Sequence, residues 1–194
     1  MTATTARKSV LIVGKSRLVL DGTVSSLRAL GYKATATSDF GDVARQFDLC
    51  NVDLVVFGGQ VPTARKAELT REIRHMNPRA GFVDGLAGIP GLLVQQVEGA
   101  FAADDDKGCL RATYEPKARA IQLTLAREAD VRLTAWWQTS FVPPDPKSDS
   151  LELLSARLAA GMHSIAVPDR IPDRAAFAVA EVGRARHVFA ITAQ

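Results

Sequence analysis

Aromatic residues, cysteine and long apolar runs are scarce in this chain, and each shortage excludes a class of protein. Only 6 % of the 194 residues are aromatic, so every core has to be built from Val, Leu, Ile and Ala. Cys50 and Cys109 stand far apart and fit no metal-binding spacing, which favours a reduced, cytoplasmic protein. No apolar stretch is long enough to cross a bilayer, and the Thr- and Ala-rich N-terminus does not have the order of a secretion signal.

The chain also lacks a large excess of charge of either sign. The chain has 24 basic and 21 acidic residues, a net charge of +3, with no basic run interleaved with aromatics. This balance gives no electrostatic reason to expect a nucleic-acid partner. His75, His163 and His187 are scattered, and none has a Cys or carboxylate at ligand spacing. We therefore expect neither a bound metal nor another cofactor.

The first half of the chain alternates between apolar runs and helical spacing. Residues 9–13 and 53–57 are short, β-branched runs that end at glycine, as buried parallel strands do. Leu20, Val24 and Leu27 recur at helical spacing, and Gly31 is typical of a helix C-cap. The full expected order is strands at 9–13, 33–37, 53–57 and 80–84, with helices around 20–27, 39–47, 69–76 and 92–101. Alternating elements predict an α/β domain with a parallel sheet, strand order 2-1-3-4 and helices on both faces.

Helical periodicity stops at the charged segment 104–108, which has the composition of a linker. Short strands separated by Pro, Gly and Asp follow, and they predict a small antiparallel all-β sandwich. The expected strands are 118–126, 131–139, 151–157, 163–167, 175–182 and 187–192. The predicted organisation is an α/β domain at 1–103, a linker at 104–112 and a β-sandwich at 113–194.

The first half resembles the receiver domain of two-component signalling, which has a flavodoxin-like fold. The matching residues are 10–13, 18–19, 27, 30–32, 53–57, 61–62 and 73–78. The second half is similar to immunoglobulin-like β modules, on the segments 131–135, 158–167 and 176–179. The receiver resemblance covers about half the chain and rests on framework positions, so it implies a fold more than an activity.

The chain departs from receivers where their chemistry takes place. The acidic pair of the family aligns with Gly14 and Lys15, and its phosphoacceptor aspartate aligns with Gly58. A Gly-Lys pair offers no carboxylate oxygens to Mg²⁺, and glycine has no nucleophile. The fifth strand-helix unit, which carries the lysine of the family, is absent before the linker. The resemblance therefore implies a pseudo-receiver that is not phosphorylated on aspartate.

Glycines gather in the loops that should follow the parallel strands, at the edge where α/β sheets bind ligands. One interpretation is a set of tight turns, or an edge on which the β domain docks. The alternative is a small-ligand or nucleotide site, which could also serve an atypical enzyme, in which backbone and a few polar side chains hold the ligand. Its residues would be Gly14, Lys15, Ser16, Gly58, Gly59, Gln60, Gly85 and Gly88. No complete P-loop or dinucleotide fingerprint accompanies them.

Trp136 and Trp137 are adjacent on an expected strand, so their side chains must point to opposite faces. One can enter the sandwich core. The other, with Phe141 and the proline-rich loop 142–146, is a candidate protein contact surface or an interdomain contact. We therefore predict a non-catalytic protein that acts through protein contacts, including self-association as a dimer, with ligand binding at the glycine edge as the alternative.

Overall fold

The computed structural model describes residues 7–102, 110–140 and 147–192. The chain divides into two compact units, Met1–Val94 and Gln95–Gln194. Among the described residues, no helix is long and apolar enough to cross a membrane. Phe141 and the loop 142–146 lie outside the described residues, as does most of the expected linker 104–112.

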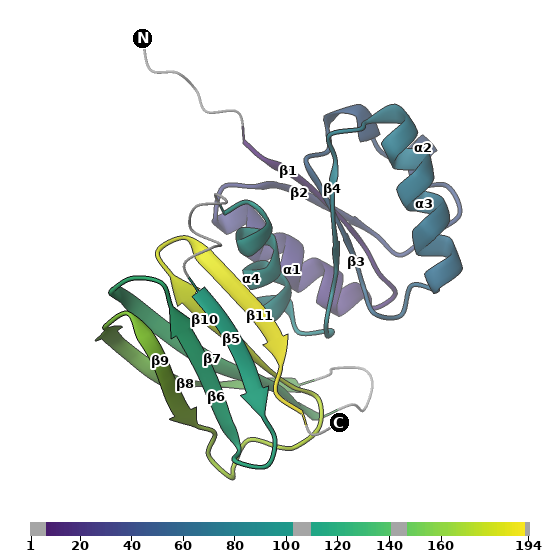
Figure 1. Ribbon diagram of the computed structural model, residues 1–194. Helices are drawn as coiled ribbons and strands as arrows, with labels where there is room; N and C mark the ends of the chain where they lie inside the picture. The colour runs from purple at the N-terminus through teal and green to yellow at the C-terminus, as the bar shows by residue number, and fades with distance from the viewer. Residues whose placement is uncertain (1–6, 103–109, 141–146, 193–194) are drawn as a thin grey trace. The chain divides into compact units, whose positions relative to one another are not determined.

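The first unit is an α/β domain built on a parallel sheet (Figure 1). Its sheet order is β2-β1-β3-β4, and every neighbouring pair is parallel, which confirms the predicted order 2-1-3-4. Its elements in chain order are β1 (Ser9–Val13), α1 (Arg17–Ala29), β2 (Lys33–Thr37), α2 (Val43–Gln46), a 3₁₀ turn (Leu49–Asn51), β3 (Leu54–Phe57), α3 (Thr63–Met76), β4 (Gly81–Asp84) and the first part of α4 (Pro90–Ala100), a helix that continues past the boundary at Val94 into the second unit.

The two central strands form because nearly every residue in them is apolar and covered on both faces. Each residue of Leu54–Phe57 is buried, as are Val10 to Val13 in β1. In Figure 1, α1 lies on one face of this sheet and α3 on the other. Leu69 and Ile73 of α3 are fully buried and pack with side chains from β1 and β3. This two-sided burial leaves only the ends of the strands accessible to a ligand.

Local signals set the helix boundaries in this unit. Ser16 caps α1, its Oγ accepting a hydrogen bond from the Val19 amide at 3.5 Å. After α1 the chain turns at Gly31, whose φ of +91° favours glycine. The helix expected at 39–47 is shorter in the structure, because residues 37–42 form a turn instead. There Thr37 Oγ1 accepts from the Asp39 amide at 3.0 Å and Asp39 Oδ1 accepts from the Gly41 amide at 2.8 Å.

The second unit contains two antiparallel sheets packed as a β-sandwich. One sheet has the order β11-β10-β7-β8 and the other β5-β6-β9. The strands are β5 (Leu110–Glu115), β6 (Ala120–Leu125), β7 (Ala129–Ser140), β8 (Lys147–Leu158), β9 (Gly161–Ala166), β10 (Ala176–Val182) and β11 (Ala185–Ala190). The predicted all-β architecture is confirmed, but the sequence pattern did not reveal β5, which begins at Leu110 inside the expected linker.

Strands of the sandwich alternate between core and outward residues. Leu133, Ala135 and Trp137 of β7 belong to the core, and the residues between them face the other way. Ile121 and Leu123 of β6 close the core from the second sheet. The register of the β7–β8 ladder shifts twice, and one of these shifts is a bulge at Leu153, between the pairs Leu133–Leu154 and Thr134–Glu152.

One arginine fastens a loop to the sandwich. Arg119 has a positive φ of 45° and holds the connection between β9 and β10. Its guanidinium forms ion pairs with Asp169, at 3.5 Å, and with Asp173. It also donates to the carbonyl oxygens of Pro168 and Ile171, at 3.3 and 2.9 Å. Two carboxylates and two peptide oxygens therefore converge on a single side chain.

Candidate functional site

The structure brings three of the predicted site residues into contact at the carboxyl edge of the parallel sheet. Gly14 follows β1, Gly58 follows β3 and Gly85 follows β4. A Cβ atom added to Gly58 would lie 3.3 Å from the Gly14 Cα, and one added to Gly85 would lie 3.8 Å from the Gly58 Cα. The three backbones touch because none of them carries a side chain.

The N–H groups of these glycines already have acceptors. Gly14 donates to the carbonyl of Thr37 at 3.0 Å, Gly58 to that of Val13 at 2.7 Å, and Gly85 to that of Phe57 at 2.7 Å. Each bond continues the strand ladder one residue beyond the end of a strand. A phosphate-binding loop needs such amides to point at the ligand, so these three do not form one.

Side chains from the helices fill the space around the same edge. A Cβ at Gly14 would come within 3.2 Å of Leu20 Cδ2, and a Cβ at Gly85 within 2.7 Å of Leu93 Cδ2. Leu20 and Leu93 are themselves buried, at 5 % and 3 % exposed. The edge between the first, third and fourth strands is therefore closed by packing.

The other predicted site residues lie around this closed edge. Ser16 uses its hydroxyl to cap α1. The remaining four, which could meet a ligand only at the surface, are exposed: Lys15, Gly59, Gln60 and Gly88.

Sequence reasoning missed an ion pair at this edge. Lys66 of α3 places its Nζ 2.7 Å from Oδ1 of Asp84, the last residue of β4. The Lys66 side chain is only 20 % exposed, whereas that of Asp84 is 72 % exposed. No sequence spacing links the two residues, because the crossover geometry alone brings α3 beside the end of β4. The carboxylate that ends β4 thus forms an ion pair with a cation of the same unit.

Asp53 lies at the opposite edge of the sheet and has a structural role. Its Oδ2 accepts from the Ser9 amide at 2.8 Å, and its Oδ1 is 3.1 Å from Lys8 Nζ. It therefore ties the starts of β1 and β3 together. Over the described parts of the chain, no group of three or more His, Cys, Asp or Glu side chains could hold a metal ion.

The adjacent tryptophans do point to opposite faces of their sheet. Trp137 is 8 % exposed and belongs to the sandwich core. Trp136 is half-buried, pairs with Phe177 of β10, and has an indole N–H without a hydrogen-bond partner among the described residues. Phe141, the third predicted contact residue, lies outside the described residues.

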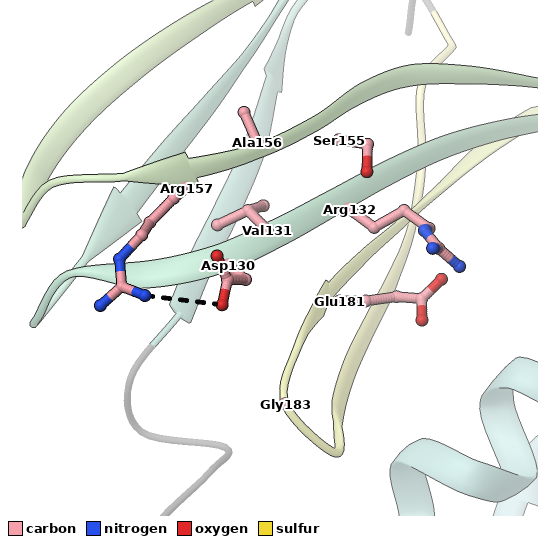
Figure 2. Close-up of a pocket in the computed structure, with 8 residues that line it drawn as sticks. All are labelled: Asp130, Val131, Arg132, Ser155, Ala156, Arg157, Glu181 and Gly183. Atoms are coloured by element: carbon pink, nitrogen blue, oxygen red, sulfur yellow. Dashed lines mark ion pairs between the residues drawn. The ribbon is translucent and has the colours of Figure 1, made fainter.

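The sandwich carries a shallow groove of about 450 Å³ on which charged side chains converge (Figure 2). Arg132 and Glu181 occupy paired positions of β7 and β10, and their side chains lie on the same side in Figure 2. Arg157 lies 3.9 Å from Asp130 at the other end of the groove. The complete lining is Asp130, Val131, Arg132, Ser155, Ala156, Arg157, Glu181 and Gly183.

Every cation of this groove has a carboxylate beside it. Arg132 is 3.4 Å from Glu152, and Arg157 is 2.5 Å from Glu128. Glu181 pairs in turn with Arg186 at 3.1 Å, and both of those side chains are 17 % exposed. The groove is consequently close to neutral, and a simple anion finds no unpaired positive charge among its lining residues. The cross-strand register creates this arrangement, so it leaves no sign in the sequence spacing.

No protein-family model matches the chain, and no curated protein matches it either.

Proposed function

We propose that the protein is a non-catalytic binding protein in which a pseudo-receiver domain, residues 1–103, is joined through a linker at 104–112 to an immunoglobulin-like sandwich, residues 113–194. In this proposal the chain acts by contacting other proteins. It does not receive a phosphoryl group on aspartate.

The closed edge of the parallel sheet is the observation that carries this proposal. The position aligned with the phosphoacceptor is Gly58, and its amide donates to Val13. A side chain there would meet the Gly14 Cα at 3.3 Å and the Val13 carbonyl oxygen at 3.4 Å. A phosphoryl group with its Mg²⁺ needs room and oxygen ligands at this point, and backbone atoms occupy that room.

The same contacts favour protein binding over the small-ligand alternative. A ligand site at the glycine edge would depend on backbone amides, and those of Gly14, Gly58 and Gly85 serve the sheet. What remains for a ligand is the exposed side chains of Lys15 and Gln60 and the exposed backbone of Gly59 and Gly88.

Incubation with acetyl phosphate and Mg²⁺, followed by intact-mass measurement, tests the proposal. We expect no mass increase. An acid-labile phosphate on the protein would overturn the proposal, and its loss in Asp84→Asn would identify the acceptor.

A thermal-shift panel of nucleotides, dinucleotides and flavins tests the alternative separately. A ligand at a hundred times its Kd stabilises the folded state by about 2.7 kcal/mol, which such a panel detects. We expect no shift. A shift that disappears in Lys15→Ala, but persists in the matched surface variant Lys33→Ala, would establish the ligand site instead.

A further inference from the structure

The strand β8 is an unusually long free edge. It ends the order β11-β10-β7-β8, so β7 pairs with one of its sides, and no other described segment pairs with the second side. It has 12 residues, whereas the other edge strands of the sandwich, β5, β9 and β11, have six each. Edge strands are commonly kept short, because their unpaired N–H and C=O groups are a template for another strand.

The bulge at Leu153 arranges the side chains of β8 in two sets. Glu152 pairs with Thr134, and Arg157 pairs with Asp130, so both face away from the core. Glu152 and Arg157 are five residues apart, so in a regular strand they would face opposite sides of the sheet. The extra residue of the bulge places both side chains on the same side.

The second set faces the core. Leu151 pairs with Ala135 and Leu158 with Ala129, and both leucines are half-buried at the rim of the core. Between Leu151 and Leu158 the core side of this edge is therefore apolar and incompletely covered, while the outward side carries opposite charges.

Each of these two sets can pair with the same set on a second copy of β8 that is related by a two-fold axis. If β8 pairs antiparallel with β8 of a second copy so that Glu152 lies opposite Arg157, Leu151 lies opposite Leu158. Each contact then occurs twice, with both charges on the outward face and both leucines on the core face. Opposite charges and apolar side chains placed directly across a ladder stabilise it, and like charges destabilise it.

The bulge is compatible with this register. With Leu153 left unpaired in both copies, Leu154 lies opposite Ala156, and Ser155 lies opposite its own copy on the two-fold axis. Leu154 and Ala156 both pair with core-facing positions of β7, so each pair across the axis shares one face of the sheet. The alternation of faces therefore continues without a break from one copy to the other.

The charges are free to exchange partners. Glu152 now pairs with Arg132, and Arg157 with Glu128 and Asp130. The side chains of Glu152 and Arg157 are 54 % and 66 % exposed, and pairs at such exposure contribute little to stability.

We propose that β8 is the interface of a homodimer, in which the two four-stranded sheets join through antiparallel β8 strands in this register. The partner is a second copy of the chain, as the isologous contact requires. The inference goes beyond the proposed function, because it holds whether or not the α/β unit receives a phosphoryl group or binds a ligand.

Sedimentation equilibrium of the full chain over a range of concentrations tests the interface. We expect a monomer–dimer equilibrium that Glu152→Arg weakens about tenfold, because both symmetric pairs become like-charge pairs. Adding Arg157→Glu to that variant should restore association. The control Met162→Arg introduces the same side chain at an exposed position of the edge strand β9 and should change nothing. Far-UV circular dichroism checks that each variant is folded.

A disulfide tests the register directly. In a Cys50→Ser/Cys109→Ser background, Glu152→Cys and Arg157→Cys are roughly 15 Å apart along one strand, too far to join within one chain. Across the proposed dimer the two positions are directly opposite, at a Cα separation of about 4.5–5.5 Å. Oxidation should give a covalent dimer of the double variant.

Each single cysteine variant is the matched control. In the proposed register Glu152→Cys alone, or Arg157→Cys alone, lies several residues from its own copy across the axis, so neither should crosslink. Equal crosslinking of the single and double variants would reject the register. A wild-type chain that stays monomeric, or a dimer indifferent to Glu152→Arg, would overturn the proposal.

Discussion

The two units bury their strands in different ways, and the difference decides where each can recognise a partner. In β1 and β3 nearly every residue is buried, because helices cover both faces of the sheet. In β7 only alternate residues enter the core, and those between them face outward. The central strands of the α/β unit can therefore present only their ends. The sandwich can present whole rows of side chains without disturbing its core.

The largest test of this contrast lies in the adjacent tryptophans. Trp137→Ala removes a core side chain that is 8 % exposed, and should lower the free energy of unfolding by about 3–5 kcal/mol. Trp136→Ala removes a half-buried, outward side chain and should cost less, about 1–2 kcal/mol. Guanidinium denaturation followed by circular dichroism measures both. Equal losses would break the comparison, because outward positions would then contribute as much to stability as core positions do.

A second test addresses the packed strand ends of the α/β unit. Gly85→Ala would place a Cβ 2.7 Å from Leu93 Cδ2 and 3.0 Å from the Phe57 carbonyl oxygen, and should destabilise by about 1–3 kcal/mol. The matched control is Gly59→Ala, whose Cβ would find its nearest neighbour, the Gly85 carbonyl oxygen, at 3.8 Å. We expect the control to change stability by less than about 0.5 kcal/mol. Similar small effects for both, in urea denaturation, would mean that the edge is loose enough to admit a ligand.

The smallest expected effect concerns pH and the sandwich alone. Desolvation lowers the pKa of His187 below its ordinary 6.5. The unfolded chain then binds a proton more readily than the folded chain, so this residue stabilises the fold above about pH 6.5 and loses that contribution as the pH falls below it. The difference in unfolding free energy between wild type and His187→Gln should therefore be constant at alkaline pH and decrease in acid. A difference that does not vary with pH would contradict this.

The architecture could be predicted because buried strands and turns require particular residue types, which can be recognised in the sequence. Apolar runs ending at glycine marked β1 and β3, and the right-handed crossover rule limited the strand order. The strand β5 (Leu110–Glu115) was missed because it follows a charged segment and begins inside the expected linker 104–112. The helix expected at 39–47 shrank to Val43–Gln46 because short polar side chains stabilise a turn before it.

The candidate site could be predicted only in part. Parallel strands end at one edge, so the sequence does imply that Gly14, Gly58 and Gly85 gather there. It does not reveal that their amides continue the ladder, since that depends on the path of the chain beyond each strand. The bulge at Leu153 is similarly hidden, because one extra residue in β8 shows only when its register with β7 is known. The sequence therefore predicts which residues meet at this edge, but it does not show that their amides are already hydrogen-bonded within the sheet.

The guanidinium of Arg119 bears on whether the connection between β9 and β10 requires a dissolved metal ion to keep its conformation. In many proteins a loop whose oxygen atoms point inward is organised by a calcium ion. Here the central cation is the guanidinium of Arg119, which is covalently part of the chain. The connection between β9 and β10 therefore needs no dissolved metal, and chelators in the buffer should leave it unchanged.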